Sequence, residues 1–178
     1  MPQPSTTIVL IHGLWMTALS WEHWVKHYAD KGYQVIAKSW PGMDIPIDDL
    51  RRDPSPIASL GVTEIVDHYE KIIRELDSPP IIIGHSFGGL IAQILLDRGL
   101  GTAGVAIAPA PVKGIIFLPL STLKVSFPAL SNPANIHRAE PLTPEQFHYA
   151  FTNNMSEEES LVVYTRYAVP GPDRVLFQ

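Results

Sequence analysis

The chain has no cysteine among its 178 residues. Disulfide bonds, thiolate zinc sites and a cysteine nucleophile are therefore excluded, and any covalent catalysis must use another side chain. Apolar runs of about 18 residues are also missing, and residues 1–5 carry no positively charged start followed by an apolar stretch. We therefore expect neither a membrane span nor a secretory signal, and a cytoplasmic protein.

Basic clusters are scarce as well. The formal net charge is −5, and the adjacent Arg51 and Arg52 are offset by Asp48, Asp49 and Asp53. Phosphate binding requires a concentration of positive charge, so a nucleic-acid partner is not expected. A diffusible, neutral or apolar small molecule fits this composition better.

Apolar segments of two kinds alternate along the first two thirds of the chain. Short β-branched runs predict buried strands at residues 6–11, 34–40, 81–83 and 102–108. Between them, apolar residues at helical spacing predict helices at 20–29, 62–76 and 87–98. This order predicts an α/β fold with a parallel, doubly wound sheet of about four strands.

The alternation ends near residue 111. Most of the 17 prolines fall within residues 41–56 and 109–144, which favours loops and excursions there. Beyond them, helices are expected at 118–130, 143–152 and 156–168, the last two begun by capping boxes. We therefore expect a core at residues 1–112 and a helical cap or lid at residues 113–178.

Ser86 lies at the junction between the 81–83 strand and the following helix, in the sequence Gly84-His85-Ser86-Phe87-Gly88. Glycines two positions on either side suit a serine held on a sharp, strained turn, because side chains there would collide with the backbone. This is the pattern of a nucleophile elbow. The alternative is that the glycines only let a helix pack closely on a sheet, with Ser86 as an N-cap.

A second motif, His12-Gly13-Leu14-Trp15, follows the first strand. With both motifs, residues 6–112 resemble the α/β-hydrolase superfamily, and within it the cap-bearing group of serine esterases and lipases. The resemblance implies Ser86 as the nucleophile, with an oxyanion hole formed by the backbone N–H groups of Leu14 and Phe87. It implies no metal and no organic cofactor.

Three further residues are candidates for lining the substrate pocket: Trp15, His12 and His85. For Trp15, and for Phe87 beside the nucleophile, packing in the core is an equally open interpretation. His12 also suits a role in bracing the oxyanion loop.

The general base and acid of a serine triad are not found by the same reasoning. After Ser86 the histidines are His137 and His148, both in the expected cap, and Asp97 and Asp173 lie at a helix end and in a terminal loop. In the family, strands that follow the cap carry the acid and the histidine. We therefore expect this chain to be the N-terminal portion of an enzyme, inactive by itself, whose C-terminal part is its partner.

The sequence thus favours a serine hydrolase that cleaves a carboxylic ester or a related apolar acyl compound through an acyl-enzyme on Ser86. Two alternatives stay open. One is a cofactor-free acyltransferase or perhydrolase, which differs in what attacks the acyl-enzyme. The other is a catalytically silent, hydrolase-like binding module.

Overall fold

Two compact units make up the chain. The structure is a computed structural model that describes residues 7–112, 114–115 and 120–178. Residues 1–44 and 62–110 form the first, here the sheet unit, and residues 45–61 and 111–178 form the second, the helical unit. The sequence assigned residues 45–61 to the core, whereas in the structure they group with the helical unit.

Four parallel strands form the centre of the sheet unit, in the order β2-β1-β3-β4. The expected fold class, a parallel sheet with helices, is confirmed. Strand β4 lies at one edge of the sheet, where the Val105 side chain is 48% exposed. The strands span Thr7–Ile11 (β1), Gln34–Ala37 (β2), Ile81–His85 (β3) and Ala103–Ile107 (β4).

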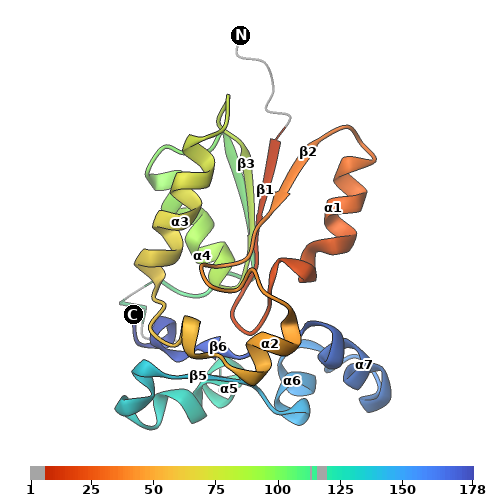
Figure 1. Ribbon diagram of the computed structural model, residues 1–178, viewed down its shortest axis with the longest axis vertical. Helices are drawn as coiled ribbons and strands as arrows, with labels where there is room; N and C mark the ends of the chain where they lie inside the picture. The colour runs from red at the N-terminus through yellow and green to blue at the C-terminus, as the bar shows by residue number, and fades with distance from the viewer. Residues whose placement is uncertain (1–6, 113, 116–119) are drawn as a thin grey trace. The chain divides into compact units, whose positions relative to one another are not determined.

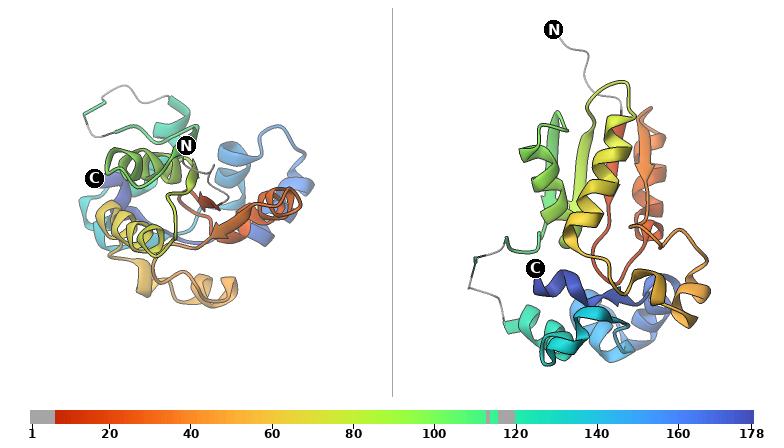
Figure 2. Two further views of the ribbon diagram at one scale, coloured as in Figure 1. Left: turned by 90° about the horizontal axis from the view of Figure 1, so that it is seen from above. Right: turned by 60° about the vertical axis from the view of Figure 1, so that its left-hand side comes forward.

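Helices cover the sheet on opposite faces (Figure 1 and Figure 2). Trp21, at the end of a 3-10 turn over Ala18–Trp21, packs with Ile8, Leu10 and Ile83 on the face of α1 (Glu22–Ala29). The other face meets α4 (Phe87–Asp97), which in turn contacts α3 (Val62–Arg74). Burial on both faces explains why the strands read as continuous apolar runs rather than as alternating ones.

Ion pairs on the α3 surface differ in one respect from the helical pattern. The spacing of four residues predicts an ion pair between Asp67 and Lys71 and another between Glu70 and Arg74. The Glu70–Arg74 pair is present, but Asp67 pairs with Arg98, which also reaches Glu70. Arg98 comes from the end of α4, and the spacing of residues along α3 alone cannot reveal a partner on another helix.

The helical unit contains α2 (Ile47–Arg52), α5 (Leu120–Leu130), α6 (Pro144–Phe151) and α7 (Glu157–Tyr167). Strands β5 (Ala139–Glu140) and β6 (Gly171–Pro172) pair in it as a small antiparallel sheet. The capping boxes at Thr143 and Ser156 are both formed, as predicted. The first residues of the excursion expected at 118–130, and residues 1–5, lie outside the described residues.

Arg51 joins the 45–61 segment to α7. Its guanidinium donates to the carbonyl oxygens of Tyr164, Thr165 and Ala168, the last at 2.8 and 3.0 Å. These carbonyls lie at the C-terminal end of α7, where the Tyr164 carbonyl also accepts from the Ala168 N–H, so a cation there adds hydrogen bonds and opposes the negative end of the helix dipole. Arg174 makes a similar link within this unit, donating to the Ser59 carbonyl at 2.6 Å.

Replacing Arg51 by methionine is therefore expected to lower the free energy of unfolding by about 2 kcal/mol, because several charge-assisted hydrogen bonds are lost together. Urea denaturation measures the change. Arg52→Met is the matched control, since Arg52 is exposed and, among the residues that the structure describes, pairs only with Asp49 in the same turn; it should change stability by less than about 0.5 kcal/mol. Equal effects of the two substitutions would contradict this role for Arg51.

Asp173 is a buried carboxyl group in the helical unit. Its side chain is 1% exposed, and Oδ2 has no hydrogen-bond partner among the described residues. The pKa of Asp173 is raised to about 6, chiefly by burial and also by the nearby Glu140 carboxylate, while Arg138 opposes the rise. The charged form is thus destabilised in the folded state.

This pKa has a consequence for stability. Below the ordinary value near 3.8 the group is neutral in both states, and above about 6 burial of the charge costs up to about 3 kcal/mol. Asp173→Asn is therefore expected to stabilise the protein at pH 7 and not at pH 3.5, measured by urea denaturation at both pH values. Glu158→Gln, at an exposed position, is the control; the same pH-dependent gain in both variants would refute the assignment.

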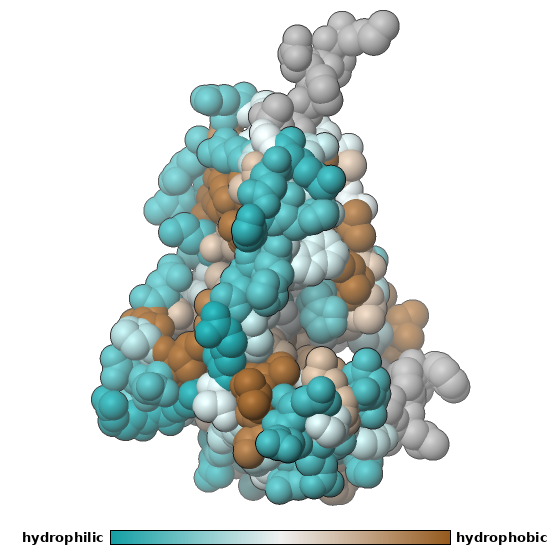
Figure 3. Space-filling view, turned by 90° about the vertical axis from the view of Figure 1, so that its right-hand side faces the viewer, coloured by the Kyte–Doolittle hydropathy of each residue, from teal (hydrophilic) through white to brown (hydrophobic). Residues whose placement is uncertain are grey.

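Exposed apolar side chains are present in both units, with Trp24 at 39% and Val162 at 67%. On the face shown in Figure 3 they occur in separate patches among hydrophilic residues. No helix of the described residues is both long and apolar enough to cross a lipid bilayer.

Candidate active site

Ser86 stands between β3 and α4 with φ 55° and ψ −121°. A non-glycine residue in this region is strained by about 1–3 kcal/mol, which persists only when the surrounding structure enforces it. Two glycines supply that enforcement. A Cβ on Gly84 would lie 1.9 Å from the Gly88 carbonyl oxygen, and one on Gly88 would lie 2.1 Å from the Ile11 carbonyl oxygen.

Backbone hydrogen bonds hold the strained residue on both sides. The Ser86 N–H donates to the Ile107 carbonyl at 3.0 Å, and the Ser86 carbonyl accepts from the N–H of Ala110 at 2.9 Å. Both partners belong to the end of β4 and the loop after it. Ala108, between them, also has a positive φ of 41°, so the loop itself bends sharply where it meets the serine.

The loop after β1 lies against the nucleophile. A Cβ on Gly13 would be 3.0 Å from Ser86 Cβ and 3.1 Å from the His85 carbonyl oxygen, so a side chain there would need these neighbours to shift by a few tenths of an ångström. Trp15, two residues on, is 9% exposed and has a φ of 64°, an unusual conformation for a bulky side chain. The structure thus brings the two motifs of the sequence together.

Two backbone N–H groups near Ser86 are free. Neither the N–H of Leu14 nor that of Phe87 has a hydrogen-bond partner among the described residues. Phe87 is the first residue of α4, where backbone N–H groups point out of the helix and the helix dipole is positive. The surroundings of Ser86 therefore suit the development of negative charge.

His12 is buried and fully hydrogen-bonded, with a side chain 1% exposed. Its Nε2 accepts from the Trp40 N–H at 3.1 Å, and its Nδ1 lies 2.9 Å from the Gly13 carbonyl oxygen. Burial lowers the pKa of His12 to about 4. Neither ring nitrogen is left for a substrate or for a proton transfer with Ser86.

Trp40 is a residue of the site that the sequence analysis missed. Its ring stacks on His12 at a centroid distance of 4.9 Å and is 1% exposed. One signal was available: Trp40 follows β2, and the carboxyl ends of parallel strands share one edge of the sheet. The turn after β4, whose backbone hydrogen-bonds to Ser86, likewise follows a parallel strand and so lies at that same edge of the sheet.

The other histidines of the sheet unit do not complete a triad. His85 is half-buried with its pKa lowered by burial, and its Nδ1 would lie 3.5 Å from a Cβ on Gly13. His23 and His27 lie on α1, and His68 lies on α3. The Ser86 hydroxyl has no hydrogen-bond partner among the described residues. Of the other candidates, Asp97 ends α4, while His137, His148 and Asp173 belong to the helical unit.

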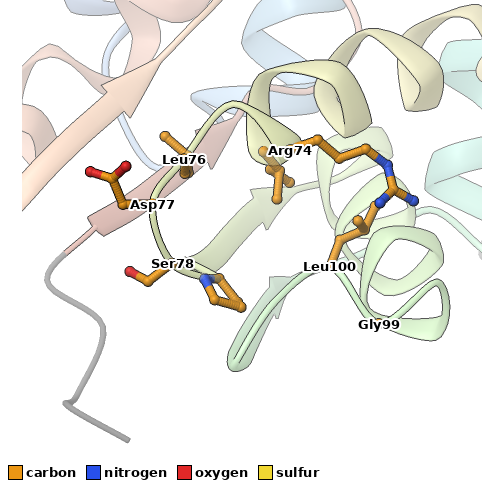
Figure 4. Close-up of a pocket in the computed structure, with 8 residues that line it drawn as sticks. Arg74, Leu76, Asp77, Ser78, Gly99 and Leu100 are labelled. Carbon is orange, nitrogen blue, oxygen red and sulfur yellow. The ribbon is translucent and has the colours of Figure 1, made fainter.

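A hollow of about 460 Å³ lies at the opposite end of β3 from Ser86 (Figure 4). Its lining comes from the ends of α3 and α4 and the segment before β3: Ile73, Arg74, Leu76, Asp77, Ser78, Pro79, Gly99 and Leu100. Arg74 already pairs with Glu70. None of the residues around Ser86 lines this hollow, so it is not part of the active-site geometry.

Comparison with known families agrees with this geometry. Residues 8–176 match the family model described as the alpha/beta hydrolase family. The chain belongs to the alpha/beta hydrolase family. The strand-turn-helix at Ser86 and the loop at Gly13 both lie within the matched residues.

Individual relatives are similar over parts of their length. An AB hydrolase superfamily protein of Bacillus subtilis, YfhM, is 33% identical over 86 residues, which are 48% of this chain and 28% of that protein. An extracellular alpha/beta-hydrolase from a Paenibacillus species has a similar structure, with a TM-score of 0.75, 24% identity and coverage of 97% of this chain and 69% of that one.

A monoacylglycerol lipase of Paleococcus ferrophilus is also similar in structure, with a TM-score of 0.62 and 20% identity, over 95% of this chain and 62% of that one. At 24% and 20% sequence identity, similarity to these two structures shows the fold alone. The chain spans less than a third of the curated Bacillus relative and about two thirds of the two solved structures.

Within the described ranges, no group of three or more His, Asp or Glu side chains is placed to hold a metal ion. The polar groups around Ser86 are instead backbone amides, carbonyls and a neutral imidazole.

Gly88 is where a small change should test the elbow. Gly88→Ala would place a methyl group 2.1 Å from the Ile11 carbonyl oxygen, so β1 and α4 must separate, and we expect a loss of more than about 3 kcal/mol of stability or failure to fold. Thermal unfolding followed by circular dichroism measures this. Gly89→Ala is the graded control, because its Cβ would lie 3.1 Å from the Pro109 side chain; a wild-type melting temperature for Gly88→Ala would contradict the close approach.

Proposed function

We propose that this alpha/beta hydrolase is a serine hydrolase that cleaves a carboxylic ester or a related acyl compound through an acyl-enzyme on Ser86. The observation that carries the proposal is the strained backbone of Ser86, with φ 55°, together with two backbone N–H groups, those of Leu14 and Phe87, that have no partner in the described part of the chain. Strain of this kind has no value for stability and is typical of functional residues.

The proposed chemistry assigns each group a step. The Ser86 Oγ attacks the carbonyl carbon while a general base takes its proton, and the oxygen of the tetrahedral intermediate is stabilised by the N–H groups of Leu14 and Phe87. The C–O bond to the alcohol then breaks, and the alcohol leaves with the proton. A water molecule attacks the acyl-enzyme in the same way, which releases the acid and restores the serine.

The general base and its acid partner are proposed to come from a C-terminal part of the enzyme beyond this chain. In the sheet unit, His12 has both nitrogens engaged, and its pKa of about 4 makes it a poor base at neutral pH. The partial coverage of the solved relatives, 69% and 62%, supports this division.

The substrate is proposed to be a small, largely apolar ester. One structural neighbour is named a monoacylglycerol lipase, which points to the same class of bond. Trp15 and His85 are proposed to line the acyl or alcohol pocket, since both flank the Gly13–Ser86 contact. His12, with 1% exposure, is too deeply buried to line that pocket.

A fluorophosphonate probe tests the proposal in the intact natural protein. Ser86 should be phosphonylated, as shown by peptide mass spectrometry, and Ser86→Ala should abolish labelling while unfolding at the wild-type temperature within a few degrees. Ser131→Ala is the control for a serine in the helical unit and should label normally. Labelling that survives Ser86→Ala would refute Ser86 as the nucleophile, and absence of labelling in the folded intact protein would refute the proposal and favour a silent binding module.

A further inference from the structure

Asp173 stands where two segments of the helical unit that are distant in the sequence meet (Figure 1). The two residues before it form β6, which pairs with β5. Its own backbone N–H extends this contact by donating to the Arg138 carbonyl oxygen at 3.0 Å. A 3-10 turn, η4 (Asp173–Phe177), begins at the same residue. We call β5, β6 and η4 together the junction.

Short elements hold the junction closed. The β5–β6 sheet has two residues in each strand. Within η4, Val175 is 2% exposed, and the neighbouring Arg174 donates to the Ser59 carbonyl oxygen. A two-stranded sheet is at best marginally stable without further packing. A modest change in free energy is therefore enough to open the junction.

The Asp173 carboxyl group lies inside the junction, with 1% of the residue exposed. Its Oδ2 is enclosed and has no hydrogen-bond partner in the described part of the chain. A neutral carboxyl group tolerates such a site far better than a carboxylate, because an ion without partners loses its hydration and gains no interaction in return. The closed junction therefore selects the protonated form of Asp173.

Charged groups nearby do not compensate for ionisation of Asp173. Glu140, on β5, repels a negative charge there, while Arg138 attracts it but also lies 3.7 Å from the Glu140 carboxylate. Against η4 pack α5 and a 3-10 turn over Pro133–His137. The other charged or titratable side chains on these elements and on η4 are Lys124, His137 and Arg174. The structure joins none of these groups to Asp173 Oδ2.

The pKa of Asp173, raised to about 6 from its ordinary value of 3.8, sets the size of the effect. In an open junction the carboxyl group meets water and ionises as an exposed aspartate does. Because the closed state holds the proton more tightly, it is favoured at low pH, and opening becomes easier as the pH rises from the lower value to the higher one. A difference of about two pH units corresponds to about a 100-fold change in the ratio of open to closed molecules.

We propose that the junction is a pH-sensitive latch of the helical unit: residues 171–177 stay packed while Asp173 is protonated and detach from residues 138–140 when it ionises. Opening breaks the hydrogen bond to Arg138 and exposes Val175, while α6 and α7 keep their contacts with each other. The latch is separate from the chemistry proposed for Ser86 and does not depend on it.

A single introduced cysteine can report opening, because the sequence has no other. Val175→Cys places a thiol at a position that is 2% exposed, and Val162→Cys, at a position 67% exposed in the same unit, is the matched reference. The measurement is the rate of reaction with 2,2′-dithiodipyridine, a reagent that reacts with thiols in acid as well as in neutral solution, in the intact protein from pH 4 to pH 8. Dividing the rate at position 175 by the rate at position 162 removes the pH dependence of the thiol itself.

The ratio of the two rates should rise by roughly 50-fold between pH 4 and pH 6 and stay level above it. Asp173→Asn, added to Val175→Cys, should hold the ratio at its acid value at every pH. Glu140→Gln should make the rise smaller, because it removes one cause of the raised pKa of Asp173. His137→Gln is the control for the histidine of the packed elements, whose charge can change over the same pH range, and it should leave the rise unchanged.

A ratio that does not change with pH, or a rise that survives Asp173→Asn, would overturn the latch. If Val175→Cys does not fold, as judged by circular dichroism, amide hydrogen exchange at Asp173 in the protein without cysteine takes its place. After correction for the intrinsic pH dependence of exchange, protection should fall by the same factor over the same pH range, and constant protection would overturn the latch. Failure of Ser86 to react with a fluorophosphonate would refute the proposed function and leave this result unaffected.

Discussion

Contact between backbones, with no side chain between them, is the constraint on which the sheet unit depends. Gly88 lies so close to the Ile11 carbonyl oxygen that a single methyl group would separate α4 from β1. The same closeness, repeated between Gly84 and Gly88, leaves Ser86 only a strained conformation. The packing of β1, β3 and α4 offsets the free-energy cost of the strained Ser86 backbone.

Backbone groups also dominate the electrostatics around Ser86. The N–H groups at the start of α4 and in the loop after β1 are dipoles fixed by the fold, so in the proposed mechanism they need no reorganisation when charge develops on the substrate oxygen. A buried His12 that stays neutral adds no competing positive charge, and both of its nitrogens are hydrogen-bonded to backbone groups. The helical unit is held in another way, by cationic side chains such as Arg51 that satisfy the carbonyls at the end of α7.

Much of the fold could be predicted because the spacing of apolar residues along the sequence indicates which side chains are buried. The four strands, the helix at Val62–Arg74 and the capping boxes at Thr143 and Ser156 each follow from local patterns. Contacts whose partner is distant in the sequence do not follow from local patterns. Asp67 pairs with Arg98 rather than with its helical neighbour, and the 45–61 segment groups with the helical unit through Arg51.

The sequence by itself determined the elbow at Ser86, since a glycine pattern between a strand and a helix has few other physical uses. It also determined the neighbouring loop motif, because both follow parallel strands. Only the tertiary structure decided what His12 does. The roles of its two nitrogens depend on the Trp40 N–H, 28 positions away along the chain, and on a carbonyl direction that no residue type encodes. Which backbone group a side chain can bind depends on which segments lie beside it, and the packing of the strands in the folded protein determines that.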